Sequence, residues 1–476
     1  MSRVSFAQVF ADLAQVSPDR VLVTADEGTL TAGQLHRGSN RWARDLAAHG
    51  VGRNDLVSVA LPNGLLFIEV CVAIWKLGAT PQPLSPKLPA ETRSAIIEVA
   101  GSVLLVDADY RPDLSFGDDD LPDAWADSWK APTSSGSTGT PKIVRAAAPA
   151  LIDPSQPVAA FIPQQAVQLV SGPLFHSATF TYAFRGLMTG HTLVVLPRFD
   201  ERRVLEAITE HRVSWLLLVP TMMHRIRRLP AVDRDRADLR SIETLLHLGA
   251  PCAPDLKRFF CDWLGAERII EVYAGTESSG LTMIRGDEWL DHPGSVGRPI
   301  GGSRFEVRDV DGAPCPPDVV GEVWMTRSGG PSYQYLGAPD RRVDGWDSLG
   351  DLGYLDADGY LYVLDRRDDL IITGGENVYP AEVERVLEQH PLVRSAVAYG
   401  VPDDDLGQRV EAVVDIGGAT FSTAHDASTG TEQLASEMLG WCRERLEPTK
   451  RPRAIRVATE PLRNDAGKAN RSTFGP

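Results

Sequence analysis

A stretch of ten residues, TSSGSTGTPK at Thr133–Lys142, combines hydroxyl side chains with two glycines and one lysine. Backbone amides in a glycine-rich turn can converge on phosphate oxygens because glycine allows close approach, and hydroxyls and lysine add donors and charge. The stretch therefore predicts a site for a polyphosphate such as ATP. It differs from the common P-loop, because Thr140 and Pro141 separate Gly139 from the lysine. Taken alone, the segment could also be a low-complexity linker.

Three further segments follow in order along the chain. They read EVYAGTESSG at Glu271–Gly280, LGDLGYLDADGYLYVLDRRDDLIITGGENVYPAEVE at Leu349–Glu384 and PLRNDAGKANR at Pro461–Arg471. Together with the glycine-rich stretch, they resemble the adenylate-forming superfamily, which includes acyl- and aryl-CoA ligases, adenylation domains of peptide synthetases and beetle luciferases. The resemblance is specific because it rests on four motifs in order. It implies attack of a carboxylate on the α-phosphate of ATP.

The resemblance also implies how the phosphates of ATP are held. Glu277 would bind Mg²⁺, since a hard cation prefers carboxylate and phosphate oxygens, and Thr276 would donate to a phosphate. A Thr-Glu pair taken alone is more often a helix N-terminus. The glycine-rich stretch would hold the β- and γ-phosphates with Thr133, Ser134, Ser137, Thr138 and Lys142.

The adenosine part of ATP would be held by residues of three motifs. By resemblance, Tyr273 stacks on adenine, and the Gly249, Ala250 and Pro251 turn covers its other face. Asp351 would accept hydrogen bonds from the ribose hydroxyls, with Arg366 assisting. Outside this context, a tyrosine after an apolar strand is usually a core residue and a Gly-Asp pair is usually a turn.

A lysine and two glycines would act at different stages of the reaction. Lys468 matches the family lysine that bridges the carboxylate and the α-phosphate during adenylation, although a single lysine near a chain end is by default solvated. In the family, the small C-terminal domain then rotates about a hinge that maps onto Asp368. The segment around Gly374 and Gly375 would thereby become one wall of a tunnel for a thiol, where missing Cβ atoms leave room.

The segment GPLFHSATFTYAFRG, residues 172–186, should line the acyl pocket. It contains no acidic residue, so an α-amino acid substrate is disfavoured because its ammonium group would lack a partner. By resemblance, His176 lies near the carboxylate and the thiol tunnel; a core histidine bonded to backbone is the alternative. Gly275 stands where many relatives have a bulky residue. We hypothesise that its missing side chain leaves volume for a larger or cyclic acyl group.

These motifs must be positioned by an α/β fold. Short apolar runs such as SWLLLVP and TLVVLP alternate with amphipathic stretches such as DERRVLEAITEHRV, and the motifs follow the apolar runs, as ligand sites do in open α/β sheets. GYLDADGYLYVLD predicts a hairpin with Asp358-Gly359 at its turn. We expect a large N-terminal domain of mixed sheets and helices, residues 1–367, and a small mobile α+β domain, residues 368–476, that carries the catalytic lysine.

Composition limits the classes of partner. The net charge of −16 disfavours nucleic acid and anionic membranes, because both recruit basic surfaces. The five cysteines are scattered without metal-ligand spacing. The N-terminus lacks the pattern of a secretory signal, and no apolar run reaches the roughly 20 residues that span a bilayer. We therefore expect a cytoplasmic protein with reduced cysteines.

The sequence as a whole predicts an ATP- and Mg²⁺-dependent acid-CoA ligase. It would activate a bulky, cyclic or aromatic carboxylic acid as acyl-AMP and pass the acyl group to coenzyme A. Two other outcomes on the same scaffold stay open: delivery to the phosphopantetheine of an acyl carrier protein or to another nucleophile, and a luciferase-like oxygenase that consumes its own adenylate. A degenerate homologue that only binds is disfavoured because the motif residues are all present.

Overall fold

The computed structural model describes residues 3–134, 142–157, 159, 161–417, 424–458, 460–463, 469 and 471–474. Its largest sheet runs, in spatial order, through β16 (Arg298–Pro299), β15 (Leu281–Arg285), β14 (Ile269–Ala274), β13 (Thr244–His247), β12 (Trp215–Leu218), β10 (Val167–Val170), β11 (Thr192–Val195), β2 (Val21–Ala25) and β3 (Gly28–Thr31). The strands from β14 to β2 pair in parallel. Both faces of their central part are buried, as apolar runs such as WLLL in β12 predict.

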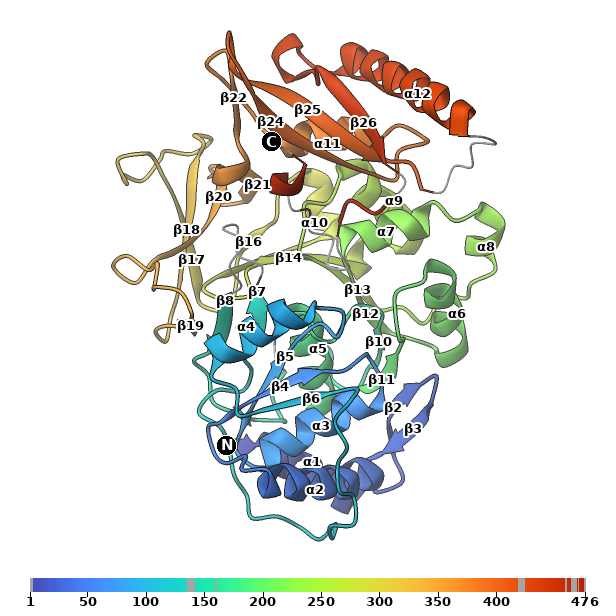
Figure 1. The fold of residues 1–476 in the computed structure, drawn as a ribbon, viewed down its shortest axis with the longest axis vertical. Coiled ribbons are helices and arrows are strands. Elements are labelled where there is room, and N and C mark those ends of the chain that lie inside the picture. The colour runs from blue at the N-terminus through green and yellow to red at the C-terminus, as the bar shows by residue number, and fades with distance from the viewer. Residues whose placement is uncertain are drawn as a thin grey trace.

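Helices cover both faces of this sheet (Figure 1). Alternate strand residues such as Leu216 and Leu245 pack on one side with α6 (Glu201–His211), α7 (Pro220–Arg227) and α9 (Pro254–Leu264). The other side packs against α5 (Ser177–Met188) and, beyond it, α1 (Phe6–Val16), α2 (Ala32–Ala48) and α3 (Leu65–Lys76). Because successive side chains of a strand point to opposite faces of the sheet, each strand contributes to two separate hydrophobic cores.

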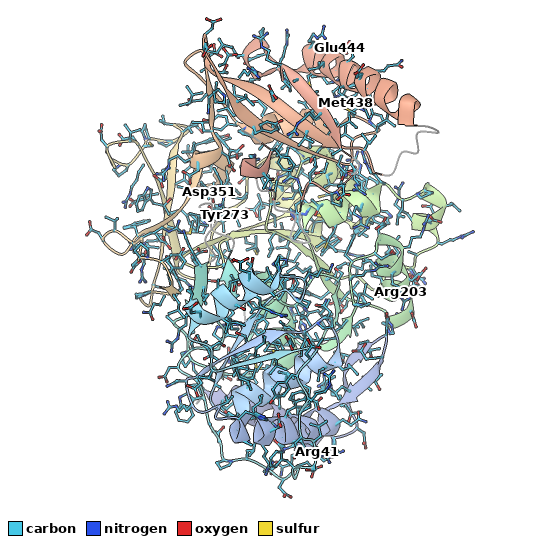
Figure 2. All side chains as sticks on the ribbon, in the orientation of Figure 1. Arg41, Arg203, Tyr273, Asp351, Met438 and Glu444 are labelled. Carbon is cyan, nitrogen blue, oxygen red and sulfur yellow. The ribbon has the colours of Figure 1, made fainter. Side chains whose placement is uncertain are left out.

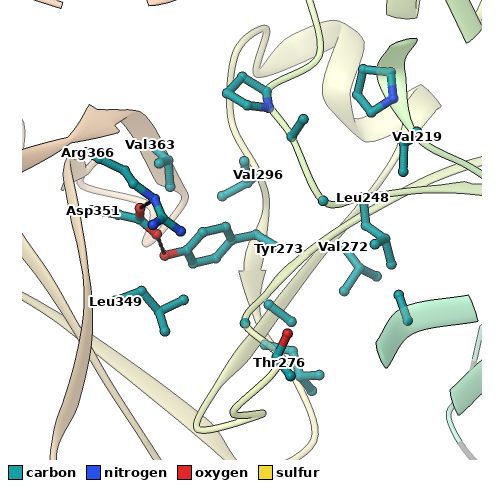
Figure 3. A pocket seen from close by; sticks show the side chains of 18 of the residues that line it. Val219, Leu248, Val272, Tyr273, Thr276, Val296, Leu349, Asp351, Val363 and Arg366 are labelled. Carbon is teal, nitrogen blue, oxygen red and sulfur yellow. Dashed lines mark hydrogen bonds and ion pairs between the residues drawn. The ribbon is translucent and has the colours of Figure 1, made fainter. Parts of the chain in front are cut away.

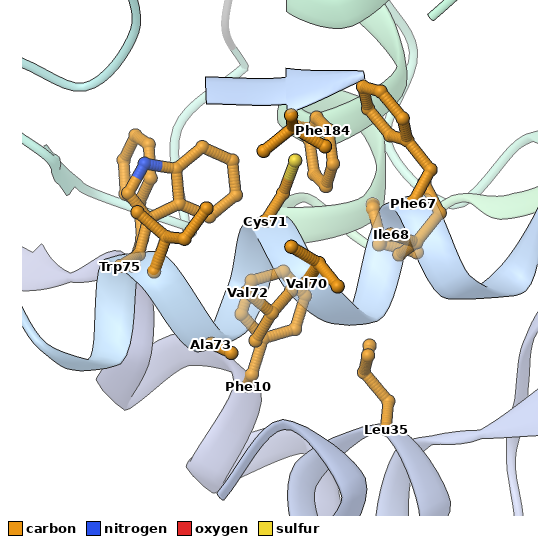
Figure 4. Close-up of a cluster of buried hydrophobic side chains, with 14 of the residues drawn as sticks. Phe10, Leu35, Phe67, Ile68, Val70, Cys71, Val72, Ala73, Trp75 and Phe184 are labelled. Atoms are coloured by element: carbon orange, nitrogen blue, oxygen red, sulfur yellow. The ribbon is translucent and has the colours of Figure 1, made fainter. Parts of the chain in front are cut away.

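Helix α3 is apolar on nearly all sides, which predicts full burial. Its Trp75 packs edge-on against Phe184 of α5 (Figure 4). It also packs edge-on against Phe6 of α1. Beside it lies a parallel sheet in the order β5 (Thr80–Pro83), β4 (Leu56–Ala60) and β6 (Leu104–Asp107), with α4 (Ala90–Ala100) nearby. This part of the chain forms a rigid base under the site.

Two antiparallel sheets flank the site. One runs in the order β19 (Tyr333–Leu336), β8 (Lys142–Ala146) and β7 (Thr133–Ser134); the other runs β17 (Ser303–Arg308), β18 (Gly321–Arg327), β20 (Asp347–Leu355) and β21 (Leu361–Arg366). The predicted hairpin is confirmed: β20 and β21 pair across the turn, where Gly359 has φ +81° and the Asp356 carboxylate accepts from the amides of Asp358 and Tyr360.

The C-terminal part forms its own sheet and core at the top of Figure 1. The sheet runs β23 (Glu376–Val378), β22 (Ile371–Thr373), β25 (Gly407–Asp415) and β24 (Ser395–Asp403), with β26 (Ala454–Ala458) paired to β25. Helices α11 (Pro380–Glu388) and α12 (Ala424–Arg445) cover it. The predicted division between residues 367 and 368 falls inside the short helix η2 (Arg367–Asp369).

Smaller elements complete the fold: β1 (Val4–Ser5), β9 (Leu151–Ile152), α8 (Ala231–Asp235), α10 (Gly286–Asp291), η1 (Ala266–Arg268), η3 (Pro448–Lys450) and η4 (Arg471–Thr473). Among the described residues, no helix combines the length and apolar character needed to cross a membrane. The expected mixed α/β architecture, with a large N-terminal and a small C-terminal part, is confirmed.

Candidate active site

A cavity of about 2520 Å³ lies between the carboxyl edge of the large sheet and the C-terminal part. Loops after β10, β13 and β14 line it from below, and β20, β21 and residues 461–463 line it from other sides. Tyr273 and Asp351 lie at mid-height in the molecule (Figure 2). The predicted site residues that line this cavity are Lys142, His176, Gly249, Ala250, Pro251, Tyr273, Thr276, Glu277, Asp351 and Arg366.

Three of these side chains form one connected group (Figure 3). The Tyr273 hydroxyl, at the end of β14, donates to Oδ2 of Asp351 on β20. Arg366 Nε lies 3.5 Å from Asp351 Oδ1. Asp351 and Arg366 face each other in the β20–β21 register, so the hairpin itself sets this pair. Burial and then the Asp351 charge raise the pKa of Tyr273, which keeps its hydroxyl a donor.

The turn after β13 faces the same space. Gly249 has φ +90°, a left-handed conformation that favours glycine. Ala250 and Pro251 follow it along the cavity wall. The Tyr273 ring at the end of β14 and the turn after β13 therefore both border the cavity, and the two strands are parallel neighbours. The sequence predicts these two groups for the two faces of adenine.

The hairpin of β7 and β8 brings the ends of the glycine-rich stretch together, with Ser134 opposite Lys142 and Thr133 opposite Ile143. Thr133 Oγ1 is buried and has no hydrogen-bond partner among the described residues, although this residue does not line the cavity. Ser137 and Thr138 lie outside the described residues, as does the side chain of Ser134.

Tyr335 on β19 links Lys142 to Glu277. The Lys142 ammonium lies 5.7 Å from the centre of the Tyr335 ring, and the Tyr335 hydroxyl donates to Glu277 Oε1 at 2.5 Å. Arg341 Nη2 is 3.7 Å from the same carboxylate oxygen. Glu277 is buried, with 7% of its surface exposed. A buried, oriented carboxylate beside a lysine has the chemistry to bind a hard cation that carries phosphate oxygens. Sequence inspection missed both Tyr335 and Arg341.

Gly275 lines the cavity, but the position that its side chain would take is already occupied. A Cβ atom added there would lie 2.8 Å from Leu349 Cδ1 and 2.9 Å from Glu277 Oε2. Leu349 therefore fills the volume that a larger residue at position 275 would take, and Figure 3 shows it beside Tyr273 and Asp351. The hypothesis that this glycine enlarges the acyl pocket does not fit the structure. Its absent side chain instead leaves room for the leucine and for the glutamate.

Gly374 and Gly375 lie away from the cavity, at the exposed turn between β22 and β23. Their φ values are +59° and +82°, so a tight hairpin turn requires glycines here independently of any thiol tunnel. Asp368, the predicted hinge, is exposed in η2.

Lys468 lies outside the described residues, but both flanks of its segment are held in place. Arg463 Nη2 donates to Glu384 Oε2 and Arg471 Nη2 donates to Glu384 Oε1, each at 2.8 Å. Arg463, Ala469 and Arg471 line the cavity. The segment that carries Lys468 thus begins and ends at the cavity wall, whereas the Gly374 turn does not reach it.

His176 is the residue before α5 and lines the cavity, with its ring centre 4.4 Å from that of Phe175. Two basic residues, Lys130 and Arg185, also line the cavity. The sequence alone did not identify them as site residues. The only local signal was a charged residue inside otherwise apolar stretches, SWKAP and AFRGLM.

The metal prediction rests on Glu277. The part of the chain that the structure describes contains no group of three or more His, Cys, Asp or Glu side chains able to hold an ion together. Glu277 fits a cation that is shared with the phosphates of a nucleotide, because one buried carboxylate supplies charge and the phosphates supply further oxygens.

Comparisons with known proteins cover nearly the whole chain. The AMP-binding enzyme family matches residues 10–127 and 131–332, and the AMP-binding enzyme C-terminal domain matches residues 382–468. The chain is 30% identical to the 2-succinylbenzoate–CoA ligase of Bacillus subtilis (strain 168), over 96% of this chain and 95% of the relative. It is also 30% identical to the fatty acid–acyl-carrier-protein ligase ScoC of Streptomyces coeruleorubidus, over 84% of each.

Among solved structures, the o-succinylbenzoate coenzyme A synthetase of Bacillus subtilis in complex with ATP and magnesium ion is similar in fold. Its TM-score is 0.81, with 27% identity and 99% of each chain covered. The likeness therefore includes both the part that holds the large sheet and the part that holds the predicted catalytic lysine.

Proposed function

This chain belongs to the AMP-binding enzyme family, and from that premise we propose that it is an ATP-dependent acid-CoA ligase. It activates a bulky, cyclic or aromatic carboxylic acid as acyl-AMP and transfers the acyl group to coenzyme A. A relative over 96% of the chain is named as a CoA ligase for 2-succinylbenzoate, an aromatic acid. The observation that supports the proposal most is that one cavity gathers groups from three separate segments: Lys142 from the first, Tyr273 and Glu277 from the second, and Asp351 from the third.

In the first half-reaction, a carboxylate oxygen of the acid attacks the α-phosphorus of ATP. The bond from that phosphorus to the oxygen shared with the β-phosphate breaks, and pyrophosphate leaves with the electron pair. Tyr273 and the Gly249–Pro251 turn hold adenine, and Asp351 with Arg366 holds the ribose, which orients the α-phosphate. Lys468 neutralises charge between the carboxylate and the phosphate as it develops.

The remaining groups hold the leaving pyrophosphate. Thr276 donates to a phosphate, and Glu277 holds Mg²⁺, which when bound offsets phosphate charge. The environment of Glu277 fits this role, since Tyr335 orients its carboxylate and Lys142 approaches the same ring. The β- and γ-phosphates are held by the hydroxyls and lysine of the glycine-rich stretch: Thr133, Ser134, Ser137, Thr138 and Lys142.

In the second half-reaction, the thiolate of coenzyme A attacks the acyl carbon, the bond from that carbon to the AMP oxygen breaks, and AMP leaves. The thiol proton passes to solvent. We assign residues 1–367 to one domain and residues 368–476 to a second that rotates about Asp368 between the half-reactions. Rotation withdraws Lys468 and brings Gly374 and Gly375 beside the thiol, near His176.

Mass-spectrometric detection of products tests the proposal. The protein is incubated with ATP, Mg²⁺ and a panel of aliphatic, aromatic and polycyclic acids, each with and without CoA. We expect acyl-CoA and AMP with CoA, and acyl-adenylate without it. The variant Asp351→Asn should lose most activity, while Asp238→Asn, which removes an acid on the far exposed surface, should not. Release of ADP, or no consumption of ATP with any acid, would overturn the assignment.

Delivery to a carrier protein is the second candidate, and the relative ScoC, named as an acyl-carrier-protein ligase, favours it. The first half-reaction is the same, but the acceptor is a protein-bound phosphopantetheine. Saturation with free CoA separates the two. If a thioester forms on a holo carrier protein and none forms with free CoA, the carrier protein is the acyl acceptor.

A further inference from the structure

Two cations line one wall of the cavity and have no acidic partner among the residues that the structure describes. Lys130, just before β7, is 6% exposed, and its ammonium donates to Ser177 Oγ and Thr181 Oγ1 of α5, each at 2.7 Å. Arg185 lies two turns farther along α5, and its buried Nε has no hydrogen-bond partner among the described residues. Both charges flank the Trp129 ring, each 4.9 Å from its centre.

The surroundings add further positive charge. Burial and then Arg185 lower the pKa of Lys130 to about 7. Burial, followed by Arg327, holds the pKa of Arg185 below its usual value; Tyr182 raises this pKa and Arg3 lowers it further. Among the described residues, no carboxylate acts on either group. The undescribed positions before residue 418 supply none, since they are Met, Ser, Gly, Thr, Pro, Val and Ala. Buried charges without a partner are costly, so such a pair is typical of a site completed by an anion.

The same cavity also has an apolar and aromatic lining. Phe161, Ile162, Ala178 and Tyr182 line it, and the last two lie on α5 with Arg185. His176, which we place near the reacting carboxylate, precedes α5, and Arg185 follows nine residues later, roughly 13 Å along a helix axis. Arg185 is therefore set apart from the reacting end, whereas Lys130, which donates to Ser177 and Thr181, lies nearer to that end along α5.

We propose that Lys130 and Arg185 form a subsite for a second anionic group of the acid substrate, so that the enzyme activates one end of a dicarboxylic acid with an aromatic or other apolar spacer. Two buried cations recognise a carboxylate by charge-assisted hydrogen bonds, with the arginine able to bind both oxygens. The inference rests on the proposed function, because it identifies the class of acid that the ligase takes.

Two other roles for the cations predict different results. If they only stabilised the fold, their replacement would destabilise the protein and affect all acids alike. If they bound a phosphate of ATP, their replacement would raise KM for ATP. A subsite for the acid instead changes kcat/KM for the acid according to its distal charge and leaves KM for ATP unchanged.

The test compares a dicarboxylic acid that has an aromatic spacer with its distal monomethyl ester, by pyrophosphate release without CoA. In the unmodified protein, we expect kcat/KM to be higher for the diacid by at least about 30-fold, the size seen when one partner of a buried charge pair is lost. In the Lys130→Met/Arg185→Met variant, this preference should fall to within about threefold of unity.

The control is Arg240→Met, which removes an exposed cation and should keep the full preference. Thermal unfolding without ligand should show Lys130→Met at least as stable as the unmodified protein, because a buried charge is removed. Equal kcat/KM for diacid and monoester in the unmodified protein, or a changed KM for ATP in the variant, would overturn the subsite and leave the ligase assignment intact. Absence of pyrophosphate release with every acid would instead reject the ligase itself.

Discussion

Lys130 shows how function competes with stability at a single residue. Its ammonium is nearly buried, and among the described residues the charged group that acts on it, Arg185, is another cation. A buried charge that lacks a counter-charge is costly to desolvate, so an apolar residue of similar length at this position should stabilise the free protein. A residue that costs stability in the free protein is best explained by what it binds.

The pH dependence of diacid activation follows from this lysine. Its pKa is lowered to about 7, first by burial and then by Arg185, so the ammonium form is present below that pH and is lost above it. We expect kcat/KM for the diacid to fall by up to about tenfold per pH unit above neutrality. Initial rates of pyrophosphate release from pH 6 to 9 measure this.

The conservative variant Lys130→Arg provides the control for this profile. Arginine stays charged throughout the range, so the decline should disappear. A decline that persists unchanged in that variant, or that appears equally with the distal monoester, would assign the titration to another group.

Helix α11 acts as an anchor for the segment that carries Lys468. Its Glu384 accepts from Arg463 on one side of the segment and from Arg471 on the other. Arg471 Nη1 also donates to Asp369, next to the predicted hinge. One buried carboxylate therefore fixes the separation of two chain positions, one five residues before the lysine and the other three residues after it.

Replacement of Glu384 should affect the two half-reactions unequally. In Glu384→Gln, both arginines lose their charged partner, and the lysine segment shifts from the reacting groups. We expect adenylation to slow by roughly 10- to 100-fold, the usual effect of misplacing a reacting group by about 1 Å. Thioester formation from supplied acyl-adenylate should change far less. Single-turnover kinetics of each half-reaction measures the two rates.

A matched control lies on the same helix. Glu382 pairs with Lys450 rather than with the arginines, so Glu382→Gln should leave both rates near those of the unmodified protein. A loss of both half-reactions together in Glu384→Gln, accompanied by a lower melting temperature, would show that Glu384 serves the fold instead.

Across the whole molecule, a contact from α7 holds the C-terminal part against the large sheet. Arg228, the residue that directly follows α7, donates to the carbonyl oxygens of His390, Pro391 and Val393. These carbonyls belong to the loop after α11, so this contact stabilises the orientation in which the segment around Lys468 faces the cavity. If the C-terminal domain rotates as proposed, this contact must break.

Loss of the contact should therefore shift the balance between orientations. We expect Arg228→Ala to slow adenylation by roughly tenfold, which corresponds to the free energy of a few hydrogen bonds from a charged donor. The rate of thioester formation from supplied adenylate should stay unchanged or rise. Rapid-quench measurements of both steps test this. The control Arg225→Ala removes a side chain of α7 that pairs with Glu201 and lies over the Phe199 ring. It should change neither step. Equal slowing of both steps would contradict the shift.

The sequence by itself determined the chemistry of the motifs and the local structure around them. A hydroxyl-rich glycine stretch, the Tyr273–Glu277 segment and the Asp358-Gly359 hairpin follow from neighbouring residues, because turn geometry and strand alternation are set within a few positions. The family resemblance rested on the same short segments, and the comparisons confirmed it.

The tertiary structure alone decided which distant side chains meet. Lys130 and Arg185 are 55 positions apart, and each looks like an ordinary surface cation until α5 packs beside the segment before β7. Leu349 occupies the space beside Gly275. Glu384 binds the two arginines, Arg463 and Arg471, that lie on either side of the segment with Lys468. Contacts between such distant side chains depend on how whole helices and strands pack against one another, and the spacing of residues in the sequence does not determine this packing.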